Sequence, residues 1–431
     1  MSTNPDNREP LLVLDCDPGC DDALAIALAI QRQPERRIDF LTVAGNVSAD
    51  QTAFNATRVL VACLGDQANS RSLAEQYHVF RGAGRSMDGE EPSAASVHGR
   101  DGLGDAPNRL IWERESEGTA TSKIDGPGFH ALLNNFMSPI ISAVERYCQL
   151  SRNADGIKRF DLLCTGPLTN LACALNLMTK SQQASFWNNC RHFVIMGGSF
   201  NSGGNITHSA EFNMFADPIA AQMVLESFDH NVQRPKGRRD TPQGEEQRSL
   251  HFVSLDTTEL VALPVDADIQ PKKGITSPAS PFLLYALKQY GLFHSFHCRR
   301  PQALLDEGIL EKFDSEKYLK AQLAGGAGDS ALKRFCYLHD PLAAWILLTG
   351  RCAQKPLWNT ACIRIDTSRG EGRGRVIVCE AMDHFRPARL PVYGTKVQWL
   401  NPSGFEHATR LEFINEMADL LGIRLPPRSA S

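Results

Sequence analysis

Short apolar runs that end abruptly in polar or glycine residues constrain the fold of this 431-residue chain more than any other sequence feature. A helix-like segment follows each run. Continuous apolar runs of this length suit strands buried on both faces, and their alternation with helices favours an α/β fold with a mostly parallel central sheet flanked by helices. We therefore predict one large Rossmann-like domain over residues 11–425. The runs cover residues 11–14, 40–44, 162–164, 193–196 and 252–255.

Three segments carry helix signals. Residues 23–30 are apolar on every side, which predicts a helix buried in the core. Asp217-Pro218 and Asp340-Pro341 each precede an apolar helical run, so each Asp is predicted to be an N-cap followed by Pro at the first helical position. Because ligands bind beyond the carboxyl ends of strands in open parallel sheets, the polar residues after the apolar runs mark the expected site.

Several polar stretches look like additions to the surface of this domain. Residues 106–128 and 231–249 are rich in glycine and polar or charged residues, and we predict that both are surface-loop insertions. Residues 366–375 have the same character. Residues 299–329 are a candidate third insertion, and residues 1–10 form a polar N-terminal tail.

Composition argues against several classes of partner and site. The net charge is −4 at pH 7, which gives no support for a nucleic-acid or membrane partner. No stretch reaches the ~20 apolar residues of a membrane helix. The N-terminus lacks the apolar core of a signal peptide, so we expect a cytoplasmic protein. The twelve cysteines include no C-x-x-C pair, and we expect reduced, mostly buried thiols instead of disulfides or a zinc site.

The densest chemical signal is the run Asp15-Cys16-Asp17-Pro18-Gly19-Cys20-Asp21-Asp22, directly after the first apolar run. Its four carboxylates repel one another unless a positive group neutralises them. A hard cation is the natural partner, and calcium takes roughly 6–8 oxygen ligands. The Pro-Gly pair predicts a tight turn that returns the last two Asp residues beside Asp17. A loop entering a helix N-terminus would explain one or two of these Asp residues, but hardly four.

This run resembles the D-x-D-P-G-x-D-D signature of the inosine-uridine preferring nucleoside hydrolase family. Further segments resemble motifs of that family in the family's order between residues 11 and 348. One such match alone would be weak, whereas the ordered set is highly specific. The segments are T-V-A-G-N at 42–46, V-H-G-R-D-G-L-G at 97–104, C-T-G-P-L-T-N-L at 164–171, the M-G-G…G-N…A-E-F-N block at 196–213, and H-D-P at 339–341.

The resemblance implies the fold of that family, calcium as its cofactor, and a role for each matching residue. The implied metal ligands are the carboxylates of Asp17, Asp22 and Asp340 and the backbone carbonyl of Thr165. The implied ribose-binding residues are Asp21, Asn46, Asn205, Glu211 and Asn213, with Met196 lining the sugar pocket.

The implied reaction is hydrolysis of the N-glycosidic bond of a ribonucleoside to free base and ribose. Such cleavage passes through an oxocarbenium-like sugar that nearby carboxylates stabilise. Asp17 would accept a proton from a water activated by calcium. His339 would protonate the leaving base, because an unperturbed His titrates near neutrality. His98 would assist on the base side or close a flexible loop. The resemblance also implies a small-molecule nucleoside as the partner and a homodimer or homotetramer as the assembly.

Each candidate also has a purely structural alternative. Taken alone, Asp340 would better be explained as an N-cap, Glu211 as a helix-start acid and Met196 as a core residue. Joint occurrence at strand ends is what favours a site. The aromatic candidates for contact with the base are more readily explained by core packing; they are Phe200, Tyr285, Tyr290 and Phe293.

Three rival functions stay open. An Asp-x-Asp motif after a strand also opens the aspartyl phosphatases, but these enzymes have Thr or Val where Gly19 stands. A non-catalytic ribonucleoside-binding protein would keep the ribose site without turnover, and the intact set of metal ligands argues against it. Hydrolysis of an unusual riboside, such as nicotinamide riboside, is compatible with the same residues.

Overall fold

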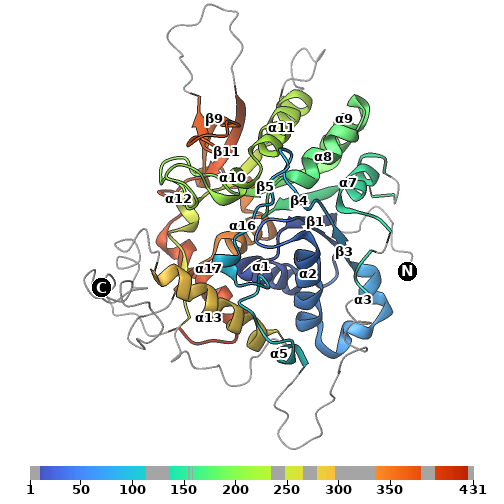
Figure 1. The fold of residues 1–431 in the computed structure, drawn as a ribbon, viewed down its shortest axis with the longest axis vertical. Coiled ribbons are helices and arrows are strands. Elements are labelled where there is room, and N and C mark those ends of the chain that lie inside the picture. The colour runs from blue at the N-terminus through green and yellow to red at the C-terminus, as the bar shows by residue number, and fades with distance from the viewer. Residues whose placement is uncertain are drawn as a thin grey trace, which may run out of the picture.

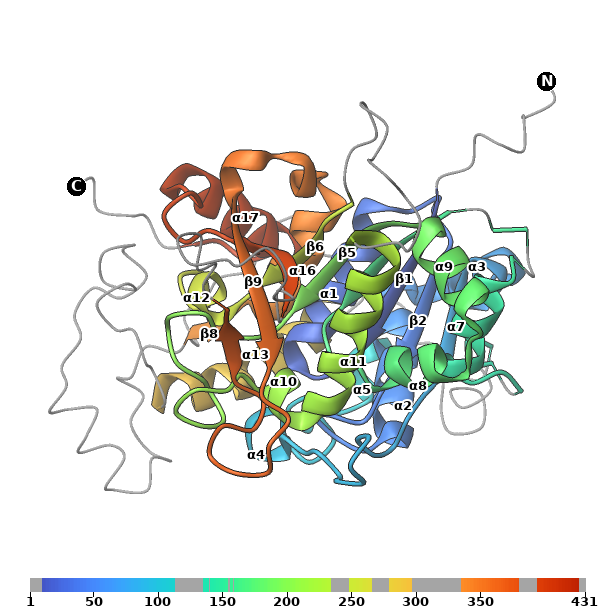
Figure 2. The same cartoon turned by 90° about the horizontal axis from the view of Figure 1, so that it is seen from above.

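A nine-stranded sheet forms the centre of the molecule (Figures 1 and 2). The computed structural model describes residues 10–112, 135–138, 140–153, 156–157, 159–233, 248–265, 279–296, 335–379 and 394–425. The strand order is β10-β9-β11-β6-β5-β4-β1-β2-β3. The strands are β1 (Leu11–Cys16), β2 (Ile38–Thr42), β3 (Tyr77–Arg81), β4 (Phe160–Cys164), β5 (Cys190–Met196), β6 (Leu250–Val253), β9 (Trp358–Ile365), β10 (Val376–Val378) and β11 (Thr395–Leu400).

The sheet is parallel except at β9, which runs antiparallel to both of its neighbours. This confirms the predicted mostly parallel α/β sheet. The chain builds β1, β2 and β3 outward in one direction and then returns to place β4, β5 and β6 on the other side of β1. The boundary between β1 and β4 is therefore the topological switch point, where such sheets bind their ligands.

Helices cover both faces of the sheet (Figures 1 and 2), and alternate residues of β1 contribute to two cores. Leu12 and Leu14 pack into one core, whereas Leu11 and Val13 pack into the other. The first core holds residues of α1 (Cys20–Arg32), α2 (Ala49–Leu64), α13 (Ser280–Phe296), α16 (His339–Leu348) and α17 (His407–Leu420). The second holds residues of α7 (Ala143–Ser151), α8 (Thr169–Leu177), α9 (Lys180–Asn189) and α11 (Pro218–Phe228).

Two of the three helix predictions are confirmed and one is wrong. Helix α1 is buried from Cys20 to Ile30, as its all-round apolar pattern predicted. Asp217 caps α11, accepting a hydrogen bond from Ala220 N at 3.0 Å. Asp340 is not an N-cap, because α16 begins at His339, two residues before Pro341, and Leu338 holds the cap position. Its carboxylate is therefore not used for capping.

The structure describes only the ends of the predicted insertions 106–128 and 231–249, and residues at these ends belong to helices or to the core. Residues 109–112 form α5 (Arg109–Trp112), and Ala106 and Ile111 are buried in the core, so residues 106–112 are not a surface loop. Residues 231–233 continue the π-helix Asp229–Gln233. Residues 113–128, 234–247 and 299–329 lie outside the described residues, as do residues 1–9.

The polar stretch 366–375 is anchored instead of free. Arg373 is buried and donates hydrogen bonds to the carbonyls of Phe215 at 2.9 Å and Ala216 at 3.2 Å. It also forms an ion pair with Asp88. The turn between β9 and β10 is thereby fixed against α10 (Phe212–Ala216), which lies beside the predicted site.

The sequence predicted neither a membrane helix nor disulfide bonds, and the described part of the chain bears on both expectations. None of its helices combines the length and apolar character needed to cross a bilayer. Its cysteines are all free thiols, although Cys63, Cys173, Cys362 and Cys379 are only partly buried.

Candidate active site

The predicted site residues meet at the carboxyl edge of the sheet, on either side of the switch point. Strands β1 and β4 pair in register, with Asp15 beside Cys164, so the segments that follow them emerge side by side. The segment after β1 carries Asp17 and leads into α1, and the segment after β4 carries Thr165. The pairing of β1 with β4 thus places the segment that carries Asp17 beside the segment that carries Thr165.

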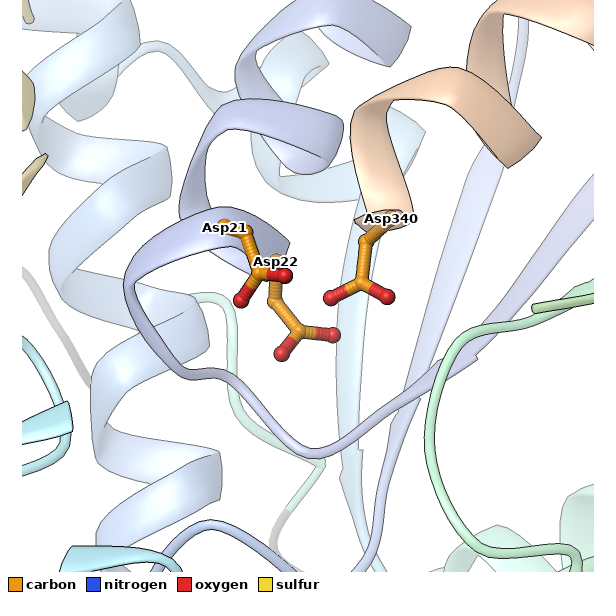
Figure 3. Close-up of side chains that lie close together, drawn as sticks. All are labelled: Asp21, Asp22 and Asp340. Atoms are coloured by element: carbon orange, nitrogen blue, oxygen red, sulfur yellow. The ribbon is translucent and has the colours of Figure 1, made fainter. Parts of the chain in front are cut away.

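Three buried carboxylates form a compact group. Asp21 and Asp22 come from the first turn of α1, and Asp340 comes from the first turn of α16 (Figure 3). Each offers an oxygen, and these oxygens all lie within 4.8 Å of one another. The structure therefore brings together the predicted metal ligands Asp22 and Asp340. It adds Asp21, which was predicted to bind ribose, and this buried acidic triad could hold a metal ion.

Asp17 lies next to this triad but is held separately. Its carboxylate accepts a hydrogen bond from Asn46 N at 2.8 Å. The Asn46 amide donates to the backbone carbonyl of Asp17 at 2.9 Å and to the Asp22 carboxylate at 3.2 Å. Asn46 was predicted to bind ribose, and in the structure its side chain links Asp17 to Asp22.

Asp17 also depends on two glycines. A Cβ at Gly45 would lie 2.0 Å from the Asp17 carboxylate, and a Cβ at Gly166 would lie 2.8 Å from its other oxygen. No side chain fits at such distances. The glycines that follow β2 and β4 therefore allow the backbone to close around Asp17.

The electrostatics of the group favour a cation. Burial, followed by repulsion from Asp22, raises the pKa of Asp21 to about 7. The same two kinds of effect raise the pKa values of Asp17 and Asp340 well above the usual range. Burial also raises the pKa of Asp22, although Gly19 N and the Thr165 hydroxyl donate to its carboxylate at 3.0 and 2.8 Å. A hard cation with oxygen ligands would stabilise the ionised forms.

Asp15 plays a different part from the other acids of the run. Its carboxylate accepts hydrogen bonds from the Tyr147 hydroxyl at 2.8 Å and the Asn170 amide at 2.9 Å. Burial nevertheless raises its pKa to about 7. Asp15 therefore connects the end of β1 to helices α7 and α8 through hydrogen bonds, and it is not a member of the triad.

The residues predicted to contact the sugar lie beyond β4 and β5. The Asn213 amide donates to the Thr165 carbonyl at 2.7 Å and to the sulfur of Met196 at 3.6 Å. Thr165 was predicted to offer this same carbonyl to the metal. Both Asn213 and Met196 are buried, so the three residues form one wall of the site.

Glu211 and Asn205 have structural contacts of their own. Glu211 is the N-cap of α10 and accepts hydrogen bonds from three backbone amides, those of Asn213 at 2.8 Å, Gly198 at 2.9 Å and Met214 at 3.2 Å. The helix-start alternative for Glu211 thus describes its contacts in this structure. Asn205 is exposed, and its side-chain oxygen accepts from Phe212 N at 2.9 Å.

The two predicted histidines are buried on the α13 and α16 side. Nδ1 of His339 lies 2.7 Å from the Thr258 hydroxyl, and Nδ1 of His98 accepts from Cys20 N at 3.1 Å. Burial lowers the pKa of His339 to about 4 and that of His98 to about 3. The premise that His339 titrates near neutrality is therefore wrong for this structure, and both rings are neutral at pH 7.

Tyr290 of α13 joins this side of the site. Its ring stacks on His98 with centroids 4.8 Å apart, and its hydroxyl donates to the Asp21 carboxylate at 3.2 Å. Phe200, by contrast, stacks on Trp399 at 4.7 Å, and Tyr285 is half-exposed. The side chain of Phe293 lies outside the described residues.

Comparison with known proteins identifies the family. Residues 12–404 match the family model of the inosine-uridine preferring nucleoside hydrolases. The chain belongs to this family. It is therefore a ribonucleoside hydrolase acting on N-glycosyl bonds, and the aspartyl phosphatase alternative is wrong.

Individual relatives agree with this family. The pyrimidine-specific ribonucleoside hydrolase RihA of Shewanella sp. (strain ANA-3) is 34% identical over 283 residues, which cover 66% of this chain and 70% of the relative. RihB of Escherichia coli (strain K12), also named pyrimidine-specific, is 31% identical over 50% of this chain and 56% of its own length.

Solved structures share the fold. A plant nucleoside hydrolase superposes with a TM-score of 0.59 at 19% identity, covering 96% of this chain and 99% of its own. The purine-preferring ribonucleoside hydrolase of Gardnerella vaginalis gives 0.55 at 20% identity, covering 96% and 98%.

The sequence did not predict that Thr258 contacts His339, and it favoured core packing for Tyr290 over its contacts with His98 and Asp21. Thr258 follows an apolar run in an Asp256-Thr257-Thr258 segment, which marked a strand end but did not indicate contact with a histidine 81 residues away. Tyr290 lies in an apolar helical stretch, where an aromatic residue usually indicates core packing. Neither contact leaves a local signal, because each joins distant segments.

Replacing Gly45 by Ala should disable the nucleoside hydrolase. The added Cβ would overlap the Asp17 carboxylate, so we expect kcat/KM for nucleosides to fall by about a hundredfold or more. Gly84→Ala is the matched control, because the nearest atom to its Cβ would be 3.9 Å away, in ordinary contact. Equal activities in the two variants would mean that Asp17 tolerates displacement.

Calcium should stabilise the protein more strongly as pH rises. The folded-state pKa of Asp21, about 7, lies above its ordinary value of 3.8, so cation-free protein loses stability as pH rises through this interval. A divalent cation such as calcium, bound to the ionised carboxylates, would reverse this loss. We expect the calcium-induced rise in Tm, measured by scanning calorimetry, to be small near about pH 5 and large near about pH 8. The same rise at both values, or an undiminished rise in Asp22→Asn, would contradict this account.

Proposed function

We propose that this enzyme hydrolyses ribonucleosides with calcium held by Asp17, Asp22, Asp340 and the Thr165 carbonyl. The observation that carries the proposal is the burial of mutually repelling carboxylates at the switch point of a nucleoside hydrolase fold. Their oxygen donors suit calcium, which accepts irregular sets of hard ligands. When bound, the ion lowers the pKa of a water molecule that contacts it.

Asp17 is the proposed general base. The backbone N–H of Asn46 donates to its carboxylate and the glycines at 45 and 166 leave room for it, so it has one defined orientation. Burial, followed by repulsion from Asp22, raises its pKa in the cation-free protein, and a bound cation would favour the ionised carboxylate that can accept a proton. The negative charges of Asp21, Asp22 and Asp340 would stabilise the oxocarbenium-like sugar as its positive charge develops.

Ribose would be oriented by residues on both sides of the carboxylates. We propose that Asp21, Asn46, Glu211 and Asn213 contact its hydroxyls, with Met196 beneath the sugar and Asn205 at the rim. Asn213 and Asn46 already reach the Thr165 carbonyl and the Asp22 carboxylate, respectively. Sugar hydroxyls that approach the metal ligands would therefore come within reach of both amides.

His339 is the proposed proton donor to the leaving base. Within the described residues, the Thr258 hydroxyl has no other hydrogen-bond partner, so we infer that it donates to Nδ1 and leaves the ring proton on Nε2. A neutral imidazole of this tautomer offers the leaving base a hydrogen bond from Nε2. To transfer a whole proton, the ring must first take one up from the solvent, so that it returns to the neutral form when the base leaves. His98 and Tyr290, stacked together, would form the other part of the base side.

Pyrimidine ribonucleosides are the proposed preferred substrates. RihA and RihB, which are 34% and 31% identical to this chain, are both named pyrimidine-specific. The purine-preferring structural relative is 20% identical, so its name carries less weight for this chain.

The proposal is tested by measuring release of free base from uridine, cytidine, inosine, adenosine, guanosine and nicotinamide riboside. The assay is run with calcium, after chelation, and after calcium is restored. We expect release that chelation abolishes and calcium recovers, with the highest kcat/KM for uridine or cytidine. Chelator-resistant release would refute the metal role. Calcium binding without release from any riboside would support the non-catalytic binding protein instead.

His339→Ala should affect substrates according to how much their leaving group needs a proton. We expect kcat to fall by about 10²–10⁴-fold with nucleosides and far less with nitrophenyl riboside, whose leaving group departs as an anion. Thr258→Val keeps the side-chain shape and removes the hydroxyl, so it should show the same selectivity with a smaller loss. Equal losses on both substrate types would rule out His339 as the donor.

A further inference from the structure

A cavity lies at the edge of the sheet opposite to the active site. It is formed around the amino ends of β5 and β6, the start of β9 and the segment after α16, and its volume is about 540 Å³. Pockets for small organic ligands span roughly 300–1,000 Å³. A smaller cavity adjoins it, and Arg248, Ser249 and Gln398 line both. The length of β5 separates this place from the acidic triad.

The lining of this far-edge cavity is basic. Among the described residues, no Asp or Glu lines either cavity, whereas Arg191, Arg248 and Lys355 line the larger one and Lys396 the smaller. Arg191 is paired with Asp161, but Asp161 is shared with Arg36, so these three residues keep a net positive charge.

Two of these cations make no ion pair within the described part of the chain. Arg248 donates to the Trp187 carbonyl at 2.6 Å, a neutral acceptor, and Lys355 is exposed at the cavity. Positive charge gathered in a concave site raises the local concentration of anions. An anionic group such as a phosphate would suit these two side chains.

The rest of the lining offers an aromatic ring and polar groups. Trp358 packs edge to face with His251 at 4.5 Å and is held by its own hydrogen bond to the Arg351 carbonyl at 3.1 Å. Nδ1 of His251 is buried and has no hydrogen-bond partner among the residues that the structure describes. Gln398 accepts from the Thr360 hydroxyl at 3.1 Å through its oxygen, which leaves its amide N–H groups to donate. A planar, hydrogen-bonding ring fits such a surface.

We propose that the far-edge cavity binds a nucleoside monophosphate. Its phosphate would lie between Arg248 and Lys355, and its base would contact Trp358 and the Gln398 amide. Inorganic phosphate alone would leave most of the 540 Å³ unfilled. This site is separate from the catalytic machinery, so the inference stands independently of the proposed hydrolytic mechanism.

Isothermal titration of the full-length protein with uridine 5′-monophosphate tests the proposal. We expect saturable binding that Arg248→Met or Lys355→Met weakens by about tenfold or more, as loss of a charge-assisted phosphate contact would. Trp358→Leu should weaken binding similarly. All three variants should keep normal nucleoside hydrolysis, which also reports that they fold. Asp22→Asn should lose hydrolysis but keep the binding.

Several results would overturn the proposal. Absence of saturable binding would do so, as would unchanged affinity in both Arg248→Met and Lys355→Met. Binding lost in Asp22→Asn would place the nucleotide in the active site. Equal affinity for inorganic phosphate or ribose 5-phosphate would exclude recognition of the base, and equal affinity for uridine would exclude recognition of the phosphate.

Discussion

Repulsion among buried carboxylates is the constraint on which the active site depends. Asp17, Asp21, Asp22 and Asp340 lie together in a buried region, where burial and repulsion from neighbouring acids raise the pKa values of Asp17, Asp21 and Asp340. Neutral donors reduce the cost: Asn46 donates to two of these carboxylates, and Thr165, Gly19 and Tyr290 donate to one each. These donors still leave a strong preference for a cation, and that preference matches the chemistry of a metal-dependent hydrolase.

The fold brings these acids together through its two central helices. Helices α1 and α16 pack in the same core and both begin at the site, so Asp21, Asp22 and Asp340 all lie in first turns. A helix N-terminus favours a negative charge. The tight approach of glycines 45 and 166 then closes the backbone around Asp17. The site is thus built from rigid element ends, and Asp21 and Asp22 come from one turn of helix.

The part of the site proposed to contact the nucleobase contains neutral histidines instead of carboxylates. His98 and His339 are buried and neutral, so their tautomers are set by hydrogen bonds from Cys20 N and the Thr258 hydroxyl instead of by solution pH. An oriented N–H can stabilise a departing base without a full proton being stored on the ring. The far edge of the sheet shows the reverse polarity, with basic residues and, within the described chain, no lining acids. One sheet therefore has a buried acidic group at one edge and a basic cavity at the other.

The sequence by itself determined the parallel sheet, the buried helix α1, the cap at Asp217 and the family. These follow from local periodicity and from short motifs, which contiguous residues encode. It also predicted that Asp22 and Asp340 bind the same metal ion, although they lie far apart in the chain, because each belongs to a motif of the family. The N-cap assignment of Asp340 failed because the start of α16 depends on how the chain leaves β8 (Phe335–Tyr337).

Tertiary structure alone decided which groups face one another across the site. It placed Asp21 beside Asp22 and Asp340. It also placed Asp15 within hydrogen-bond distance of Tyr147 and Asn170, and Glu211 at the N-cap of α10. It also lowered the pKa of His339 and linked that ring to Thr258. Burial and contacts between distant segments produce these effects, and neither is encoded in the residues adjacent to the groups they change.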